Sequence, residues 1–312
     1  MNYRTIDDMN QAILRRLHIF PRDIDLIVGI PRSGMFPANL LALYLNCRVT
    51  DLGSFVNGHI YQSGDRGKYI GTGDFKKILV VDDSIDKGGA MARCRELLKG
   101  FNDRYDIKYC AIYTVPDKRN EVDYYVEVVP LPRYFQWNIM NHMILKKACF
   151  DIDGVLCVDP TPEENDDGER YREFLLNAKP LFVPKVEIGA LVTSRLEKYR
   201  AETEQWLARN GVKYGKLVML DLPDMASRRK ANCHGRFKAE EYKKSQYVLF
   251  VESNPRQAVE INSLTRKPVL CTADFKMVFD SQSVLYNIMQ GQRLPWLRRT
   301  ALKLRDYLRS RR

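Results

Sequence analysis

The sequence predicts an α/β protein built from two doubly wound, Rossmann-like parallel-sheet domains. Its length of 312 residues exceeds the usual size of one domain. In each half, a short apolar run ends in two carboxylates and continues into a turn that contains glycine. This pattern occurs at residues 78–90 and again at residues 148–156. Such apolar runs are typical of buried parallel strands, so each half is expected to carry its own sheet.

The composition excludes several classes of protein. The seven cysteines include no Cys-x-x-Cys pair, which argues against a disulfide framework or a zinc site and favours the reducing cytoplasm. The sequence begins without an apolar signal region, and no apolar run approaches transmembrane length. Residues 293–312 hold eight basic residues and one acid, so +7 of the net charge of +11 is in this tail. The remaining +4 predicts no nucleic-acid surface.

In the first half, we expect a polar helix over residues 5–17, a strand over 24–30 and an apolar helix over 36–45. Two more strands are expected at 109–113 and 124–129. Residues 57–74 contain five glycines and two basic residues, which is compatible with a lid over a ligand or with a plain loop.

The most informative segment is residues 78–90. Asp82 and Asp83 are expected where the apolar strand ends, and Gly88 and Gly89 precede a helical pattern over 90–98. Carboxylates accept hydrogen bonds from sugar hydroxyls, and backbone N–H groups at a helix N-terminus bind phosphate. The segment therefore predicts a site for a phosphorylated sugar, with an ordinary strand–turn–helix as the alternative.

This segment resembles the 5-phosphoribosyl-1-pyrophosphate (PRPP) motif of type I phosphoribosyltransferases, with Lys87 where a small hydroxyl residue is usual. The resemblance implies that Asp82 and Asp83 bind the ribose, that loop 86–90 binds the 5-phosphate, and that Asp86 is a general base for the acceptor. It also implies that the loop after the first strand binds pyrophosphate together with Mg²⁺. The expected PRPP-binding residues are Arg32, Ser33, Gly34, Asp82, Asp83, Asp86, Lys87, Gly88, Gly89 and Ala90.

The second half contains a different set of candidate catalytic residues. Asp151 and Asp153 follow an apolar run, and Thr193 and Glu252 follow two others. These residues, with Lys238, resemble the four motifs of the haloacid dehalogenase (HAD) superfamily. The family often has a second acid where Asn254 stands, and Arg229 or Lys230 could replace Lys238. About forty residues separate successive motifs, which leaves little room for a cap domain.

The HAD resemblance implies a specific role for each residue. Asp151 would be the nucleophile, Asp153 the general acid and base, and Thr193 a donor to the transferring phosphoryl group. Lys238 would supply the cation. Magnesium would be held by Asp151, Asp153 and Glu252.

Two other segments leave alternatives open. The aromatic run over residues 132–138 could stack an acceptor, but we favour packing at the domain boundary. Leu297, Ala301, Leu304 and Leu308 form one apolar stripe in a basic tail that begins near Trp296. This tail could pack on the second domain, lie at the inner face of a membrane, act as a nucleic-acid arm or mediate a homodimer.

Together these expectations define a phosphoribosyltransferase-like domain over 1–145, an HAD-like phosphatase over 146–290 and a basic helix over 291–312. The fusion predicts transfer of 5-phosphoribosyl from PRPP to an acceptor, followed by removal of the 5-phosphate. A glycan or lipid-linked sugar is the favoured acceptor. The alternatives are a nucleobase phosphoribosyltransferase with an attached nucleotidase, and a PRPP-sensing regulatory protein without turnover.

Overall fold

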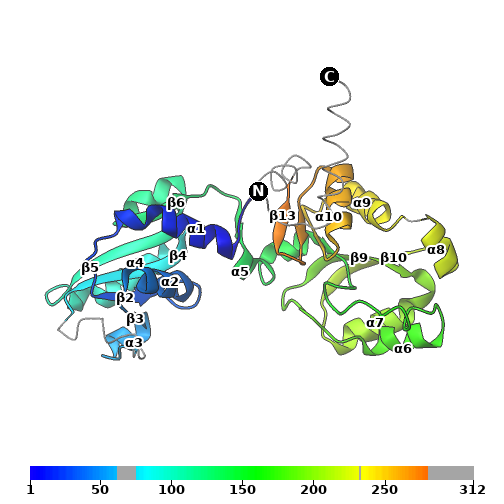
Figure 1. Ribbon diagram of the computed structural model, residues 1–312, viewed down its shortest axis with the longest axis horizontal. Coiled ribbons are helices and arrows are strands. Elements are labelled where there is room, and N and C mark those ends of the chain that lie inside the picture. The colour runs from blue at the N-terminus through cyan, green and yellow to red at the C-terminus, as the bar shows by residue number, and fades with distance from the viewer. Residues whose placement is uncertain (62–74, 232, 280–312) are drawn as a thin grey trace, which may run out of the picture. The chain divides into compact units, whose positions relative to one another are not determined.

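The computed structural model describes residues 1–61, 75–231 and 233–279, drawn in colour in Figure 1. The chain divides into two units, residues 1–137 and 138–312, so the division falls before the expected boundary at 145. Most of the expected lid and the whole tail helix lie outside the described residues. Within the described residues, no helix is long and apolar enough to cross a membrane.

Unit 1 is built around a five-stranded sheet in which every pair of strands is parallel. The order β3-β2-β4-β5-β6 reverses direction next to the first strand, as expected of a doubly wound sheet. In that spatial order, the bounds are β3 (Arg48–Asp51), β2 (Leu26–Gly29), β4 (Lys77–Ile85), β5 (Asp106–Thr114) and β6 (Tyr124–Val128).

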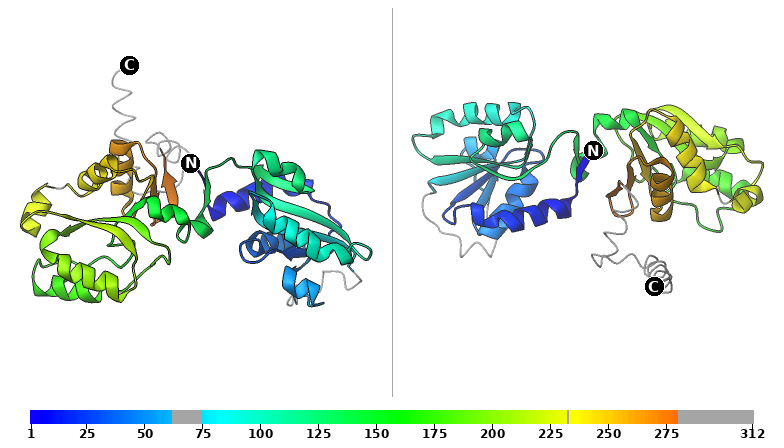
Figure 2. Two further views of the ribbon diagram at one scale, coloured as in Figure 1. Left: turned by 180° about the vertical axis from the view of Figure 1, so that it is seen from behind. Right: turned by 90° about the horizontal axis from the view of Figure 1, so that it is seen from above.

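Alternating side chains of this sheet supply two separate cores. Ile27 and Leu79 pack with α1 and α2 on one face, and Val28 and Val80 pack with α3 and α4 on the other. Figure 2 shows these helices on the two sides of the sheet. Because both faces are covered, the strands read as continuous apolar runs, which is why the sequence predicts them well. The helices are α1 (Ile6–Arg16), α2 (Met35–Leu45), α3 (Leu52–Val56) and α4 (Gly89–Leu98).

A second, two-stranded parallel sheet in unit 1 joins the start of the chain to its later part. It pairs β1 (Asn2–Arg4) with β7 (Arg133–Phe135), and α5 (Gln136–Ile139) follows directly. An ion pair between Arg4 and Glu127 ties this small sheet to β6. The small sheet therefore fixes the position of the aromatic run at its end.

Unit 2 contains a six-stranded mixed sheet in the order β10-β9-β8-β11-β12-β13. All of its pairs are parallel except β12 with β13. Helices α9 and α10 pack on one face of the sheet. The strands are β8 (Ala148–Phe150), β9 (Ile188–Leu196), β10 (Tyr214–Leu220), β11 (Leu249–Glu252), β12 (Val269–Cys271) and β13 (Lys276–Val278). The helices are α6 (Glu169–Asn177), α7 (Arg200–Arg209), α8 (Met225–Ala231), α9 (His234–Lys244) and α10 (Pro255–Thr265).

The fold class is therefore confirmed as α/β with parallel sheets, but two strand ends differ from the expectation. Asp82 and Asp83 lie inside β4, which continues to Ile85 because it stays paired with the long strand β5. Thr193 likewise lies inside β9, which continues to Leu196. In both cases the neighbouring strand extends the pairing past the polar residues.

Candidate active sites

In unit 1, the loop after β2 lies directly against the carboxylates of β4. Ser33 Oγ donates a hydrogen bond to Asp83 Oδ1 at 2.9 Å. A Cβ atom at Gly34 would lie 2.5 Å from the carbonyl oxygen of Ile30 and 2.8 Å from that of Val81. Only glycine fits this contact without a shift of the backbone, so the predicted pyrophosphate loop and the predicted ribose carboxylates form one site.

The two adjacent carboxylates differ in their surroundings. Asp82 and Asp83 are both buried, and the backbone N–H of Asp83 donates to Asp82 Oδ1 at 2.8 Å. Burial, and then the neighbouring charge of Asp83, raise the pKa of Asp82 to about 8. Asp83 instead accepts hydrogen bonds from Ser33 and from the indole N–H of Trp137, which is 2.7 Å from its Oδ2.

Loop 86–90 connects β4 to the N-terminus of α4 and is largely exposed. Gly88 has a φ of +82°, and a Cβ atom there would lie 2.5 Å from Glu121 Oε2. Asp86, Lys87, Gly89 and Ala90 are exposed, so the backbone and side chains of this loop are accessible to a phosphate.

The aromatic run has two roles. Phe135 is buried and stacks on Tyr113, so this residue packs, but in a core of unit 1 rather than between the domains. Trp137 stacks on Phe135 with ring centroids 4.8 Å apart, but it also donates to Asp83. The run therefore packs the core and also borders the carboxylates that the sequence predicts to bind ribose. The sequence predicts the aromatic cluster but not this hydrogen bond.

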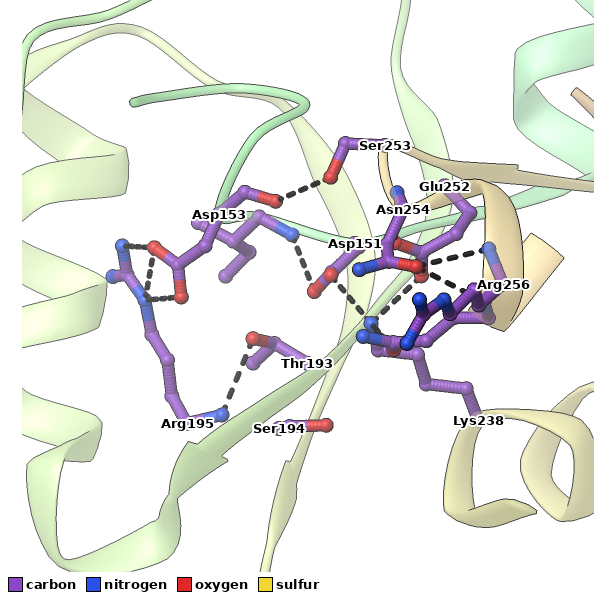
Figure 3. A network of polar contacts seen from close by, with 12 residues as sticks. Asp151, Asp153, Thr193, Ser194, Arg195, Lys238, Glu252, Ser253, Asn254 and Arg256 are labelled. Atoms are coloured by element: carbon purple, nitrogen blue, oxygen red, sulfur yellow. Dashed lines mark hydrogen bonds and ion pairs between the residues drawn. The ribbon is translucent and has the colours of Figure 1, made fainter. Parts of the chain in front are cut away.

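In unit 2, three separate segments converge on one buried ammonium group. Lys238 Nζ, from α9, lies 2.5 Å from Asp151 Oδ2, 2.7 Å from Glu252 Oε2 and 2.8 Å from Gln257 Oε1 (Figure 3). Burial opposes the charge on Lys238, but Asp151 and Glu252 outweigh it and raise the pKa of the lysine. Burial and the charge of Asp151 raise the pKa of Glu252 to about 7.

Asp153 faces a different cation. Figure 3 shows its carboxylate turned toward the guanidinium of Arg195, whose Nη2 is 2.7 Å from Asp153 Oδ1. The Nε atom of Arg195 is 3.2 Å and 3.1 Å from the two carboxylate oxygens. The backbone N–H of Arg195 also donates to Thr193 Oγ1 at 3.3 Å. This arginine therefore holds both predicted catalytic side chains in position.

The acidic side chains of unit 2 offer a partial fit to magnesium. Within the residues that the structure describes, no group of three His, Cys, Asp or Glu is placed to hold a metal ion. The side chain of Asp153 is directed to Arg195, so the prediction that it is a ligand gains no support. Asp151 and Glu252 remain as an all-oxygen pair of carboxylates, and Mg²⁺ is commonly bound through one or two carboxylates plus water.

Asn254 has a local structural role. Its side-chain oxygen accepts hydrogen bonds from the backbone N–H groups of Arg256 and Gln257 at the start of α10. Asparagine is among the best residues at this N-cap position. Capping therefore explains why asparagine stands here in place of an acid. Glu252, in β11, is the acid that shares the ammonium group of Lys238 with Asp151.

A cleft of about 600 Å³ opens beside these residues, and Asp151, Asp153 and Glu252 line it. Asp159 also lines it because the turn after β8 folds back, with the backbone N–H of Gly154 donating to the carbonyl of Cys157 at 2.7 Å. A Cβ atom at Gly154 would lie 2.3 Å from Ser253 Oγ and 2.9 Å from Asp159 Oδ2. Gly154 also has a φ of +72°, so glycine is favoured in this turn, where the two side chains approach the backbone.

Comparison with known proteins identifies the family of unit 1. Residues 3–141 match the family model of the phosphoribosyl transferase domain. The N-terminal half of this chain is a type I phosphoribosyltransferase domain. The match covers the β2 loop, β4, loop 86–90 and Trp137, and it ends before β8.

Relatives of the phosphoribosyltransferase domain include two curated proteins. A xanthine-guanine phosphoribosyltransferase of Chromohalobacter salexigens is 29% identical over 139 residues, which span 42% of this chain and 78% of that protein. The corresponding protein of Idiomarina loihiensis is 29% identical over 124 residues, or 38% of this chain and 73% of that protein. Among solved structures, a purine phosphoribosyltransferase from Pyrococcus horikoshii is 26% identical over 44% of this chain and 92% of that chain, with a TM-score of 0.30.

Arg195 and Asp159 are not among the residues predicted from the sequence, and neither is the hydrogen bond from Trp137 to Asp83. Arg195 could have been predicted from the sequence, because a strand residue two positions after Thr193 points to the same face of the sheet. Trp137 depends on the pairing of β1 with β7, which joins segments more than a hundred residues apart. Asp159 has no local signal, since a loop positions it.

We expect Gly34→Ala to reduce phosphoribosyl transfer on the order of ten- to hundredfold, because the methyl group displaces the loop from the backbone of β4. Steady-state kinetics with varied PRPP concentration would measure the loss. Gly100→Ala is the matched control, since a Cβ atom there meets nothing within 4 Å. Equal activity of both variants would contradict this packing argument.

Asp82 makes the stability of the phosphoribosyltransferase domain depend on pH. Its folded pKa is raised, so its contribution to stability is fully present below the unfolded value of 3.8 and is lost as pH rises through about 8. We expect Asp82→Asn to raise the melting temperature of the ligand-free protein at pH 9 more than at pH 5. Thermal melts at both pH values test this, and an equal change at both would contradict it.

Proposed function

We propose that the protein couples PRPP-dependent phosphoribosyl transfer in unit 1 to phosphate-ester hydrolysis in unit 2. The transferase part is supported by the family of residues 3–141 and by the contact of the β2 loop with Asp83. The phosphatase part is carried by one observation. Lys238, Asp151 and Glu252, from three distant parts of the chain, meet within hydrogen-bond distance beside a cleft.

In the transferase reaction, the loop after β2 binds the pyrophosphate of PRPP, and the start of α4 binds its 5-phosphate. Asp83, held by Ser33 and Trp137, accepts a hydrogen bond from a ribose hydroxyl. The neighbouring carboxylates favour the positive charge that develops on the ribose as pyrophosphate departs. Asp86, on the exposed loop, accepts the proton of the acceptor.

In the phosphatase reaction, Asp151 attacks phosphorus, and the ester oxygen leaves with a proton from Asp153. Asp153 then takes a proton from the water that hydrolyses the aspartyl-phosphate. Arg195 orients Asp153, Thr193 donates to the phosphoryl group, and Lys238 balances the charge of Asp151 and Glu252. Mg²⁺ held by Asp151 and Glu252 would stabilise the phosphoryl charge.

The order of the two reactions follows from their chemistry. The transfer product retains the 5-phosphate of PRPP, and a phosphomonoesterase can remove that group. Hydrolysis makes the two-step reaction irreversible, which draws the transfer equilibrium toward product. The proposed final product is therefore a ribosyl derivative without phosphate.

A purine base is the acceptor that the comparisons favour, since the curated relatives of unit 1 are xanthine-guanine phosphoribosyltransferases. Trp137, beside Asp83, supplies an aromatic side chain near the reacting ribose. A glycan hydroxyl is the second candidate. It is favoured by the cleft of unit 2, whose described lining consists mainly of carboxylate, amide, hydroxyl and aliphatic groups and includes no aromatic ring.

An acceptor screen tests the proposal. Purified protein is incubated with PRPP, Mg²⁺ and either guanine, xanthine, hypoxanthine or a set of glycan acceptors, and pyrophosphate release is measured. Turnover with a purine supports the first candidate, and turnover with glycans alone supports the second. PRPP binding without turnover of any acceptor would favour the regulatory alternative over both.

A further inference from the structure

We propose that the unit 2 cleft recognises the ribose ring of a 5-phosphorylated ribose, accepts any uncharged group at C1 and rejects a second phosphate there. This inference rests on the proposed phosphatase function and names the substrate that the cleft takes. It assigns to Asp159 the role of accepting hydrogen bonds from the ribose hydroxyls. Asp159 lies six residues after Asp153 and belongs to none of the motifs that suggest the phosphatase.

Asp159 is placed beside the proposed reaction centre. It lines the same cleft as Asp151, and its Oδ2 lies against Gly154, next to the catalytic turn. Its side chain is exposed and lines the cleft, and no hydrogen bond or ion pair with another described residue engages its carboxylate. A carboxylate that lines the cleft beside the turn after Asp151 can accept hydrogen bonds from the hydroxyls of the sugar that carries the phosphate.

The lining of the cleft is acidic. Asp151, Asp153, Asp159 and Glu252 all line the cleft, whereas the described lining includes no Lys, Arg or His side chain. The nearby cations Lys238 and Arg195 are buried and already engaged by carboxylates. With one divalent cation, this site can neutralise one phosphoryl group. A second phosphate on the substrate would face Asp159 and be repelled.

The remaining wall of the cleft is polar. Ser253, Asn254, Gln257 and Thr272 contribute hydroxyl and amide groups, which pair with neutral hydroxyl-rich molecules. Leu181 is the large apolar side chain of the described lining, and it is about half exposed. Because no ring of the described lining could stack a base, the affinity of the cleft should come from the phosphate and the sugar.

The test compares substrates that share the ester but differ elsewhere. Ribose 5-phosphate, guanosine 5′-monophosphate, ribose 1,5-bisphosphate and p-nitrophenyl phosphate are assayed for phosphate release with Mg²⁺. We expect kcat/KM for the first two to agree within about threefold and to exceed that for the bisphosphate by about tenfold or more. A clear preference for the nucleotide over ribose 5-phosphate would overturn the inference.

The Asp159→Asn variant tests the assigned residue. We expect KM for ribose 5-phosphate to rise about tenfold, as for loss of a hydrogen bond to a charged group, with p-nitrophenyl phosphate hydrolysis unchanged. Glu173→Gln, an exposed acid of α6 outside the cleft lining, is the control. Equal losses for both substrates, or no change for either, would overturn the assignment.

A binding measurement separates failure of this inference from failure of the proposed phosphatase. If even p-nitrophenyl phosphate is not hydrolysed in an Asp151-dependent way, the phosphatase proposal fails. Calorimetric titration of Asp151→Asn with ribose 5-phosphate and Mg²⁺ then remains informative. Loss of binding in the double variant Asp151→Asn/Asp159→Asn supports the sugar site. Equal binding by the single and double variants contradicts it.

Discussion

Asp151→Asn is expected to reduce phosphate release from ribose 5-phosphate by about a thousandfold or more, while phosphoribosyl transfer continues. An amide cannot form the aspartyl-phosphate, so the loss should appear in kcat rather than in KM. The substitution keeps the size of a side chain that is buried against Lys238. Phosphate release and pyrophosphate release, measured on the same preparation, report the two activities separately.

The contrast between the two activities is what makes this variant informative. The proposed transferase residues all belong to unit 1, and Asp151 belongs to unit 2. Loss of both activities would indicate misfolding or a dependence of one site on the other. Retention of phosphate release would show that Asp151 is not the nucleophile and would remove the basis for the phosphatase assignment.

Lys238→Met is expected to abolish phosphate release and to lower the stability of unit 2 by about 3–5 kcal/mol. Removing the ammonium leaves Asp151 and Glu252 buried without their cation, and an uncompensated buried charge is strongly destabilising. Urea denaturation followed by circular dichroism measures the stability, and phosphate release measures the activity. The loss of stability should be smaller at low pH, because Glu252, whose pKa is raised to about 7, is then protonated and neutral.

Lys230→Met is the matched control, because Lys230 is an exposed alternative cation in the same basic stretch. It should leave both stability and phosphate release unchanged within about twofold. If Lys230→Met proved as damaging as Lys238→Met, the assignment of the catalytic cation would be wrong.

The sequence predicts those parts of the fold that local patterns determine. Buried parallel strands appear as apolar runs, so β2, β4, β5 and β8 are found close to their observed positions. Strand ends are less predictable. Asp82 and Thr193 suggest ends because they are polar, but pairing with β5 and β10 carries the strands further.

The site residues, too, can be predicted only where a local motif marks them. Asp83 and Asp151 stand in short motifs whose chemistry is visible in the sequence. The contact of Lys238 with Asp151 spans 87 residues and can be proposed only through a family resemblance. Trp137 and Asp159 reach their sites through a small sheet and a loop turn, and neither arrangement leaves a periodic pattern in the sequence.

The most direct test of the central claim is the mass of the product formed from PRPP and an accepted acceptor in the presence of Mg²⁺. The wild-type protein should yield a ribosyl product without phosphate, and Asp151→Asn should accumulate the same product with one phosphate group. Asp83→Asn should yield little of either. A phosphorylated product from the wild-type protein as well as from Asp151→Asn would contradict the proposed coupling of transfer and dephosphorylation.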